Sequence, residues 1–116
     1  MNRLIDKKCE PCEGKTQPLS KEKAAGYLPE VQGWQIDAAG KLIARDFTMK
    51  NFVAAVTFIQ KIAEVAEAEN HHPDIHLTGY RKLRIELSTH AIGGLSENDF
   101  IVAAKVNALP AELKVK

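Results

Sequence analysis

Apolar and polar residues alternate with different periods along the chain, and each period predicts an element. Ser20 is a residue type that caps helices, and residues 21–28 after it are expected to form a short helix. Residues 31–36 and 41–47 alternate apolar with polar side chains, and the Asp and Gly within residues 37–40 are typical of a turn. We therefore expect a helix followed by a hairpin.

The longest stretch of apolar residues at helical spacing predicts a helix over residues 49–70. Thr48 can cap its start, and Pro73 is expected to stop it, because the residue before a proline is disfavoured in the α region. So wide an apolar surface fits a well-covered core helix, and it equally fits a helix that also packs on a second subunit. The stripe consists of Phe52, Val56, Ile59, Ala63 and Ala66, widened by Val53, Phe58, Ile62 and Val65.

The last part of the chain predicts two more strands and a final helix. Residues 74–77 and 83–88 alternate in period two, Gly93 and Gly94 form a loop, and Ser96 can cap the helix that follows. The order helix, strand, strand, helix, strand, strand, helix predicts an α+β fold. We expect a four-stranded antiparallel sheet with helices packed on one face.

The composition of the 116 residues is that of an ordinary globular domain, with 45% hydrophobic and 27% charged residues. A net charge of +1 without long basic runs argues against a nucleic-acid surface. No apolar run approaches the ~20 residues of a membrane span, and the start has no apolar core of a secretory signal. We therefore expect a cytoplasmic protein that binds neither nucleic acid nor membrane.

Residues 1–17 are polar and show no regular spacing of apolar residues. We therefore expect a flexible N-terminal lead there, followed by a single domain over residues 18–116. Cys9 and Cys12 lie in this lead, at a spacing that zinc sites and redox pairs also use. Structural zinc would need two more ligands nearby, and a redox pair is expected between a strand and a helix. We favour a reduced tail without function.

All four histidines fall within residues 67–99, and three of them stand at the ends of expected elements. His71 and His72 end the long helix, and His90 follows the last strand, so these imidazoles can converge on one ligand. His76 takes an outward position on its strand, where we expect an ordinary surface histidine. A plain polar helix end is the alternative for the first two.

Two carboxylates accompany these histidines. Glu67 lies four residues before His71 on the same helix face, where it can hold the imidazole in one tautomer. Asp99 lies three residues after Ser96, which is the spacing of a capping box. A role for Asp99 near a ligand is also open, since a helix start gathers N–H donors.

The residue types favour proton transfer over other chemistry. Adjacent His71 and His72 lack the i, i+4 spacing that points two imidazoles at one zinc ion. No serine lies in a nucleophile-elbow context, neither cysteine is near the histidines, and the Gly93-Gly94 pair lacks phosphate-loop spacing. We expect acid/base catalysis by imidazoles with no metal or other cofactor.

This set of motifs resembles the pterin-4a-carbinolamine dehydratase family over about residues 19–109. Some members carry a tryptophan soon after the His-His-Pro sequence, whereas this chain has Ile75 in that region. The matching residues are Glu67-x-x-x-His71-His72-Pro73, Tyr80, His90 and Asp99, with Leu87-Ser88-Thr89-His90, Gly94-Leu95-Ser96-Glu97 and Gly33-Trp34 in addition.

The resemblance implies homodimers or homotetramers and a specific reaction. That reaction is the loss of water from 4a-hydroxytetrahydrobiopterin, giving quinonoid dihydropterin for the recycling of tetrahydrobiopterin. His71 and His90 are implied as the acid/base pair, and His72 as the residue that holds and polarises the pterin. The implied site residues are His71, His72 and His90 for catalysis, and Glu67, Pro73 and Asp99 for substrate binding or for orienting the imidazoles.

Two other functions stay open beside this one. Some family members act as dimerisation partners of transcription factors, so the chain can instead be a binding module without catalysis. A pterin enzyme that serves molybdopterin metabolism would keep the same fold and pocket.

Overall fold

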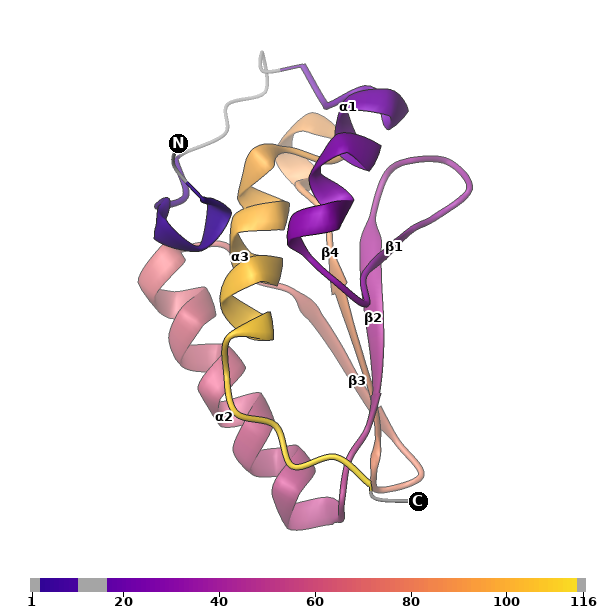
Figure 1. Ribbon diagram of the computed structural model, residues 1–116, viewed down its shortest axis with the longest axis vertical. Helices are drawn as coiled ribbons and strands as arrows, with labels where there is room; N and C mark the ends of the chain where they lie inside the picture. The colour runs from indigo at the N-terminus through magenta and orange to yellow at the C-terminus, as the bar shows by residue number, and fades with distance from the viewer. Residues whose placement is uncertain (1–2, 11–16, 115–116) are drawn as a thin grey trace.

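The computed structural model describes residues 3–10 and 17–114 and has a four-stranded antiparallel sheet with helices on one face (Figure 1). The predicted α+β fold and element order are confirmed, with strands arranged β1-β2-β4-β3. No helix in the described ranges is long and apolar enough to cross a membrane. The elements are α1 (Lys21–Tyr27), β1 (Gln35–Ile36), β2 (Ile43–Thr48), α2 (Phe52–Glu69), β3 (Asp74–Thr78), β4 (Lys82–Leu87) and α3 (Glu97–Asn107), with 3-10 turns at Leu4–Asp6, Leu28–Glu30 and His90–Ile92.

The covered face of the sheet carries the apolar side chains that strand alternation predicts. Phe47 of β2 pairs with Leu83 of β4, and the Phe47 ring meets the Phe58 ring of α2 edge-on with centroids 5.1 Å apart. Residues 98–104 of α3 are all buried, as expected for a helix covered on several sides. The start of α3 is therefore firmly held, and Asp99 lies there.

The long helix begins and ends at residues other than those expected. Thr48 ends β2, and the side chain of Asn51 caps α2 instead by accepting a hydrogen bond from a main-chain N–H of the first turn at 2.8 Å. At the other end, Asn70 has a left-handed backbone with φ of 51°, so the helix stops at Glu69, before Pro73 is reached. Asn is one of the few residues besides Gly that adopt this conformation readily.

The first hairpin is shorter than predicted, because β1 has only two residues. Gly33 has a φ of 89° and belongs to a turn that interrupts the extended run expected over residues 31–36. The turn at residues 37–40 is confirmed, and its Asp37 Oδ1 accepts a hydrogen bond from the Lys41 N–H at 2.7 Å.

The buried side of α2 differs from the predicted stripe. Phe58 and Ile62 are buried at its centre, whereas Phe52 and Val53 leave 53% and 71% of their surface exposed. Helical spacing gives the width of an apolar surface, but it does not say which part of that surface meets the sheet. The exposed part faces solvent in the single chain.

Residues 3–10 pack on the domain, which differs from the separate lead expected over residues 1–17. Leu4, in the first 3-10 turn, is buried in the core, and Lys7 Nζ lies 3.0 Å from Glu97 Oε2. One buried leucine is too short a signal for periodicity to reveal. Cys9 is a half-buried free thiol, and Cys12 lies outside the described residues.

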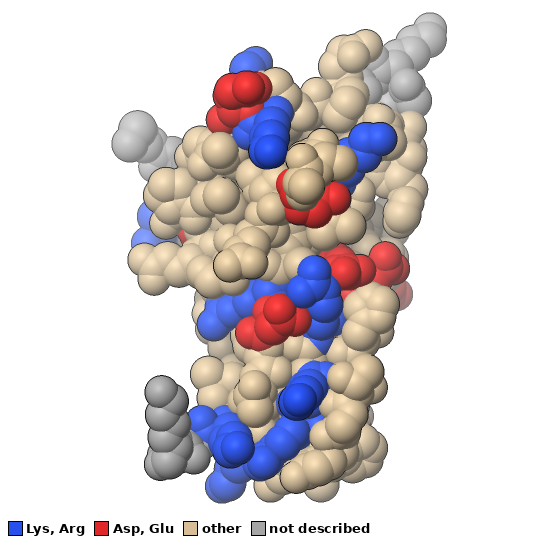
Figure 2. Space-filling view, turned by 90° about the vertical axis from the view of Figure 1, so that its right-hand side faces the viewer, with Lys and Arg blue, Asp and Glu red and all other residues tan. Residues whose placement is uncertain are grey.

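The uncovered face of the sheet is polar. Arg84 bridges Asp46 and Glu86, and His76 Nε2 lies 3.1 Å from Glu86 Oε1. Figure 2 views the side of the molecule away from α2 and shows acidic and basic side chains mixed across its middle. His76 is thus a surface histidine, as expected, in an exposed ion-pair network.

Candidate active site

A cavity of about 520 Å³ lies where α2 ends and where the loop after β4 leads into α3. His71, His72 and His90 all line it, so the chain brings together the three histidines that the sequence singled out. They come from two segments that are well separated in sequence. The cavity is also lined by Ser88 and Thr89, at the end of β4.

The left-handed Asn70 sets the directions of the two adjacent histidines. It ends the α2 hydrogen-bond ladder, and the His71 N–H donates back to the Ala66 carbonyl at 3.1 Å. His71 then turns inward, with 12% of its side chain exposed, while His72 turns outward, with 56% exposed.

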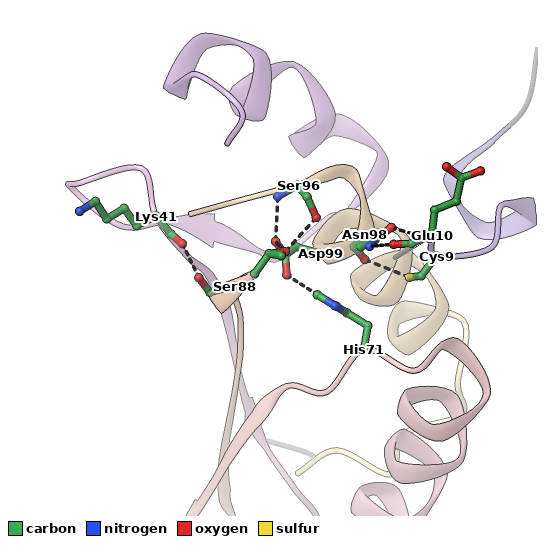
Figure 3. A network of polar contacts seen from close by, with 9 residues as sticks. Cys9, Glu10, Lys41, His71, Ser88, Ser96, Asn98 and Asp99 are labelled. Carbon is green, nitrogen blue, oxygen red and sulfur yellow. Dashed lines mark hydrogen bonds and ion pairs between the residues drawn. The ribbon is translucent and has the colours of Figure 1, made fainter. Parts of the chain in front are cut away.

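His71 is held by Asp99, a fully buried carboxylate in the first turn of α3. The His71 Nε2 atom lies 2.7 Å from Asp99 Oδ1 (Figure 3). The other oxygen, Oδ2, accepts hydrogen bonds from the Thr89 hydroxyl at 2.8 Å and from the Ser96 N–H at 3.0 Å. Because a carboxylate only accepts, His71 carries its proton on Nε2, and Nδ1 is the nitrogen that can take a proton.

The capping box predicted at Ser96 and Asp99 is confirmed, and the same carboxylate also binds His71. A helix cap and a histidine partner are therefore one group. Thr89 at the end of β4 joins this arrangement through its hydroxyl, so three elements fix the Asp99 side chain.

Glu67 pairs with His72 and not with His71, contrary to expectation. Its Oε2 atom makes a short contact with His72 Nε2, and both side chains are largely exposed. The i, i+4 geometry holds only while the helix continues, and α2 ends at Glu69, two residues before His71.

His90 begins the 3-10 turn after β4 and stands exposed at the cavity. Its loop is closed by a hydrogen bond from the Thr89 N–H to the Gly94 carbonyl at 2.8 Å and by Gly93, whose φ is 68°.

Pro73 is half-buried just after His72 and is not among the described residues that line the cavity. Asp99 is not among the residues that line the cavity either, and it is connected to the cavity by its hydrogen bond with His71.

Three further residues, Lys8, Cys9 and Glu10, line the cavity without a role predicted from the sequence. The expectation that neither cysteine lies near the histidines is wrong for Cys9, because residues 3–10 fold back onto the domain. Burial, together with the nearby Glu69 carboxylate, raises the pKa of the Cys9 thiol from 9.0 to about 12. The thiol is therefore uncharged near neutral pH. The only signal in the sequence was the apolar Leu4-Ile5 pair shortly before it.

Glu69 is another residue that lines the cavity and that had no predicted role. Burial raises the pKa of this carboxyl. Hydrogen bonds from the Lys105 ammonium at 2.6 Å and from the Cys9 N–H at 2.8 Å lower the pKa by more than burial raises it, so the pKa lies below the usual value.

Within the described ranges, no group of three or more His, Cys, Asp or Glu side chains is arranged to hold a metal ion.

The family model described as pterin 4 alpha carbinolamine dehydratase matches residues 17–109 of this chain. A relative from Halorhodospira halophila that carries this family's name is 47% identical over 108 residues, which are 93% of this chain and 98% of the relative. The matched range contains all four histidines and Asp99 but not residues 3–10.

A plant relative and a solved structure extend the comparison. Pterin-4-alpha-carbinolamine dehydratase 2, mitochondrial, from Arabidopsis thaliana is 44% identical over 112 residues, 94% of this chain and 60% of that protein. The crystal structure of a transcriptional coactivator/pterin dehydratase from Brucella melitensis is 32% identical with a TM-score of 0.73, and it covers 79% of this chain and 97% of that one.

Proposed function

The chain belongs to the pterin-4a-carbinolamine dehydratase family, a family of hydro-lyases, and we propose that it removes water from 4a-hydroxytetrahydrobiopterin to give quinonoid dihydropterin. The observation that carries this proposal is the cavity in which His71, backed by buried Asp99, stands with His72 and His90.

The reaction needs one proton donor and one proton acceptor. The C4a–O bond breaks as the hydroxyl takes a proton and leaves as water, while N5 of the ring loses its proton and forms a double bond to C4a. Each such transfer by a placed side chain contributes ~10²–10⁴-fold in rate. Imidazoles suit both transfers, because their ordinary pKa lies close to neutral pH.

His71 suits the part of base because Asp99 holds its Nε2–H and keeps Nδ1 as the nitrogen that can take a proton. When His71 takes that proton, the buried carboxylate balances the new positive charge. The Thr89 and Ser96 donors keep Asp99 from turning away during this exchange.

His90 completes the acid/base pair and His72 binds the pterin. Both are exposed at the cavity, where they exchange protons with solvent and the departing water can escape. The contact with Glu67 fixes the orientation of His72 at the rim, and Pro73 fixes the backbone that follows it. We assign the acid to His90 because it reaches the cavity from a different segment than His71.

An enzyme fits these observations better than a binding module without catalysis. A module that only dimerises with a regulator has no need for three imidazoles on one cavity or for a buried carboxylate on one of them. Dehydratase chemistry in molybdopterin metabolism would use the same residues, and turnover in cells lacking an aromatic amino acid hydroxylase would favour it.

We further propose that the protein is a homodimer or homotetramer in the cytoplasm. Phe52 and Val53 on α2 are mostly exposed in the single chain, and a second copy would bury them. The free thiol of Cys9 fits a reducing compartment. A monomeric sedimentation profile at micromolar concentration would contradict the assembly.

The direct test of the function is a stopped-flow measurement of 4a-hydroxytetrahydrobiopterin decay with purified protein. We expect catalytic amounts to accelerate the decay and to keep doing so in the presence of a metal chelator. Decay at the uncatalysed rate would contradict the proposal.

A further inference from the structure

One wall of the cavity comes from a part of the chain outside the family-matched range. Lys8, Cys9 and Glu10 line the same cavity as His71 and His90, whereas the family model matches only residues 17–109. These three residues follow the 3-10 turn whose Leu4 is buried in the core.

Buried polar side chains hold this wall in place. The Cys9 N–H donates to Glu69 Oε1 at 2.8 Å, and Glu10 exchanges two hydrogen bonds with Asn98 (Figure 3). Glu69 and Asn98 are buried, with 8% and 7% exposure, and burial of such groups is costly unless they are hydrogen-bonded. Two elements of the domain thus supply partners for the main chain of residues 9 and 10.

The anchors of the wall lie next to the proposed acid/base machinery. Glu69 is two residues before His71 at the end of α2, and Asn98 directly precedes Asp99 at the start of α3. Lys8 Nζ also donates to the Ala68 carbonyl at 3.2 Å. The wall and the His71–Asp99 pair are therefore fixed by the same two helix ends.

The chemistry of the wall suits a flat ring. The high pKa of Cys9 keeps its thiol uncharged, and the Cys9 Sγ atom lies 3.6 Å from the Asn98 carbonyl oxygen. An uncharged, polarisable sulfur makes favourable contacts with aromatic rings. The Cys9 thiol can therefore contact a bicyclic heterocycle without exchanging protons with it.

We propose that residues 8–10 are a substrate-binding wall of the pterin pocket, with the Cys9 side chain packed against the pterin ring. This inference rests on the proposed dehydratase function and adds a binding element to it. The wall acts in binding alone, so changes in it alter KM and leave kcat nearly untouched.

The test compares bulky substitutions on two sides of the same segment. Cys9→Trp places an indole in the cavity, whereas Asp6→Trp places it at an exposed position that does not line the cavity. We expect Cys9→Trp to raise KM, and the dissociation constant of 7,8-dihydrobiopterin, about tenfold or more with kcat within about threefold. Asp6→Trp should match the wild type.

A second variant keeps the test decisive if Cys9→Trp does not fold, as judged by thermal unfolding. Lys8→Trp changes an exposed side chain of the same wall and should raise KM in the same way. An unchanged KM in the folded wall variants, or a fall in kcat at unchanged KM, would contradict the proposal that residues 8–10 bind the substrate. A wild type that neither binds nor dehydrates the pterin would overturn both proposals, so the two failures are distinguishable.

Discussion

His71 Nε2 lies 2.7 Å from Asp99 Oδ1, although 28 residues separate the two in the sequence. The contact joins the end of α2 to the start of α3, and the same carboxylate caps α3 through the Ser96 N–H. One buried group therefore serves both the stability of the fold and the orientation of an imidazole.

Asp99→Asn is expected to damage both roles. The amide lacks the negative charge that balances a protonated His71, and its NH2 group cannot accept the hydrogen bonds that Oδ2 receives. We expect kcat to fall about 10- to 10²-fold and the free energy of unfolding to fall by about 1–2 kcal/mol. Stopped-flow decay and urea unfolding measure the two effects.

Ser96→Ala is the matched control for the capping role alone. It removes the hydroxyl but leaves the main-chain N–H that donates to Asp99. We expect a loss of about 1 kcal/mol in stability and a kcat within about threefold of wild type. An equal loss of kcat in Ser96→Ala and Asp99→Asn would show that only the cap matters.

The lowered pKa of Glu69 makes the stability of the fold depend on pH. Its pKa is held below the ordinary value of 4.5, so the ionised carboxylate stabilises the fold above that pH, and this contribution disappears as the pH falls through the lowered pKa. We expect urea unfolding of Glu69→Gln to lose less stability than wild type between about pH 5 and about pH 3. Glu64→Gln, an exposed position on the same helix, should keep the wild-type dependence.

The Cys9 thiol is expected to react slowly in the folded protein. A shift of its pKa from 9.0 to about 12 lowers the thiolate fraction at neutral pH about a thousandfold. In a Cys12→Ser background, alkylation by iodoacetamide at about pH 8 should be slower in the native than in the urea-unfolded chain by about two to three orders of magnitude. Similar rates in the two states would contradict the burial of this thiol.

The sheet and the helices could be predicted because they depend on local pattern. Alternation in β4 placed Leu83, Ile85 and Leu87 on the covered face, and the Ser96–Asp99 spacing marked the start of α3. The convergence of His71, His72 and His90 on one cavity also followed from their places at element ends.

What could not be predicted depends on single residues and on long-range contacts. The left-handed backbone at Asn70 changes which histidine meets Glu67, and helical spacing gives no sign of it. The wall at residues 8–10 is held by Glu69 and Asn98, which lie 60 and 88 residues away from their partners. No local period carries such information.

The most direct measurement is stopped-flow decay of 4a-hydroxytetrahydrobiopterin with His71→Ala, His90→Ala and the double variant, with His76→Ala as control. We predict that each single variant loses about 10²-fold or more in kcat. With the folded double variant, the substrate should decay at the uncatalysed rate, and His76→Ala should match the wild type. A folded double variant with wild-type kcat would contradict catalysis by these imidazoles.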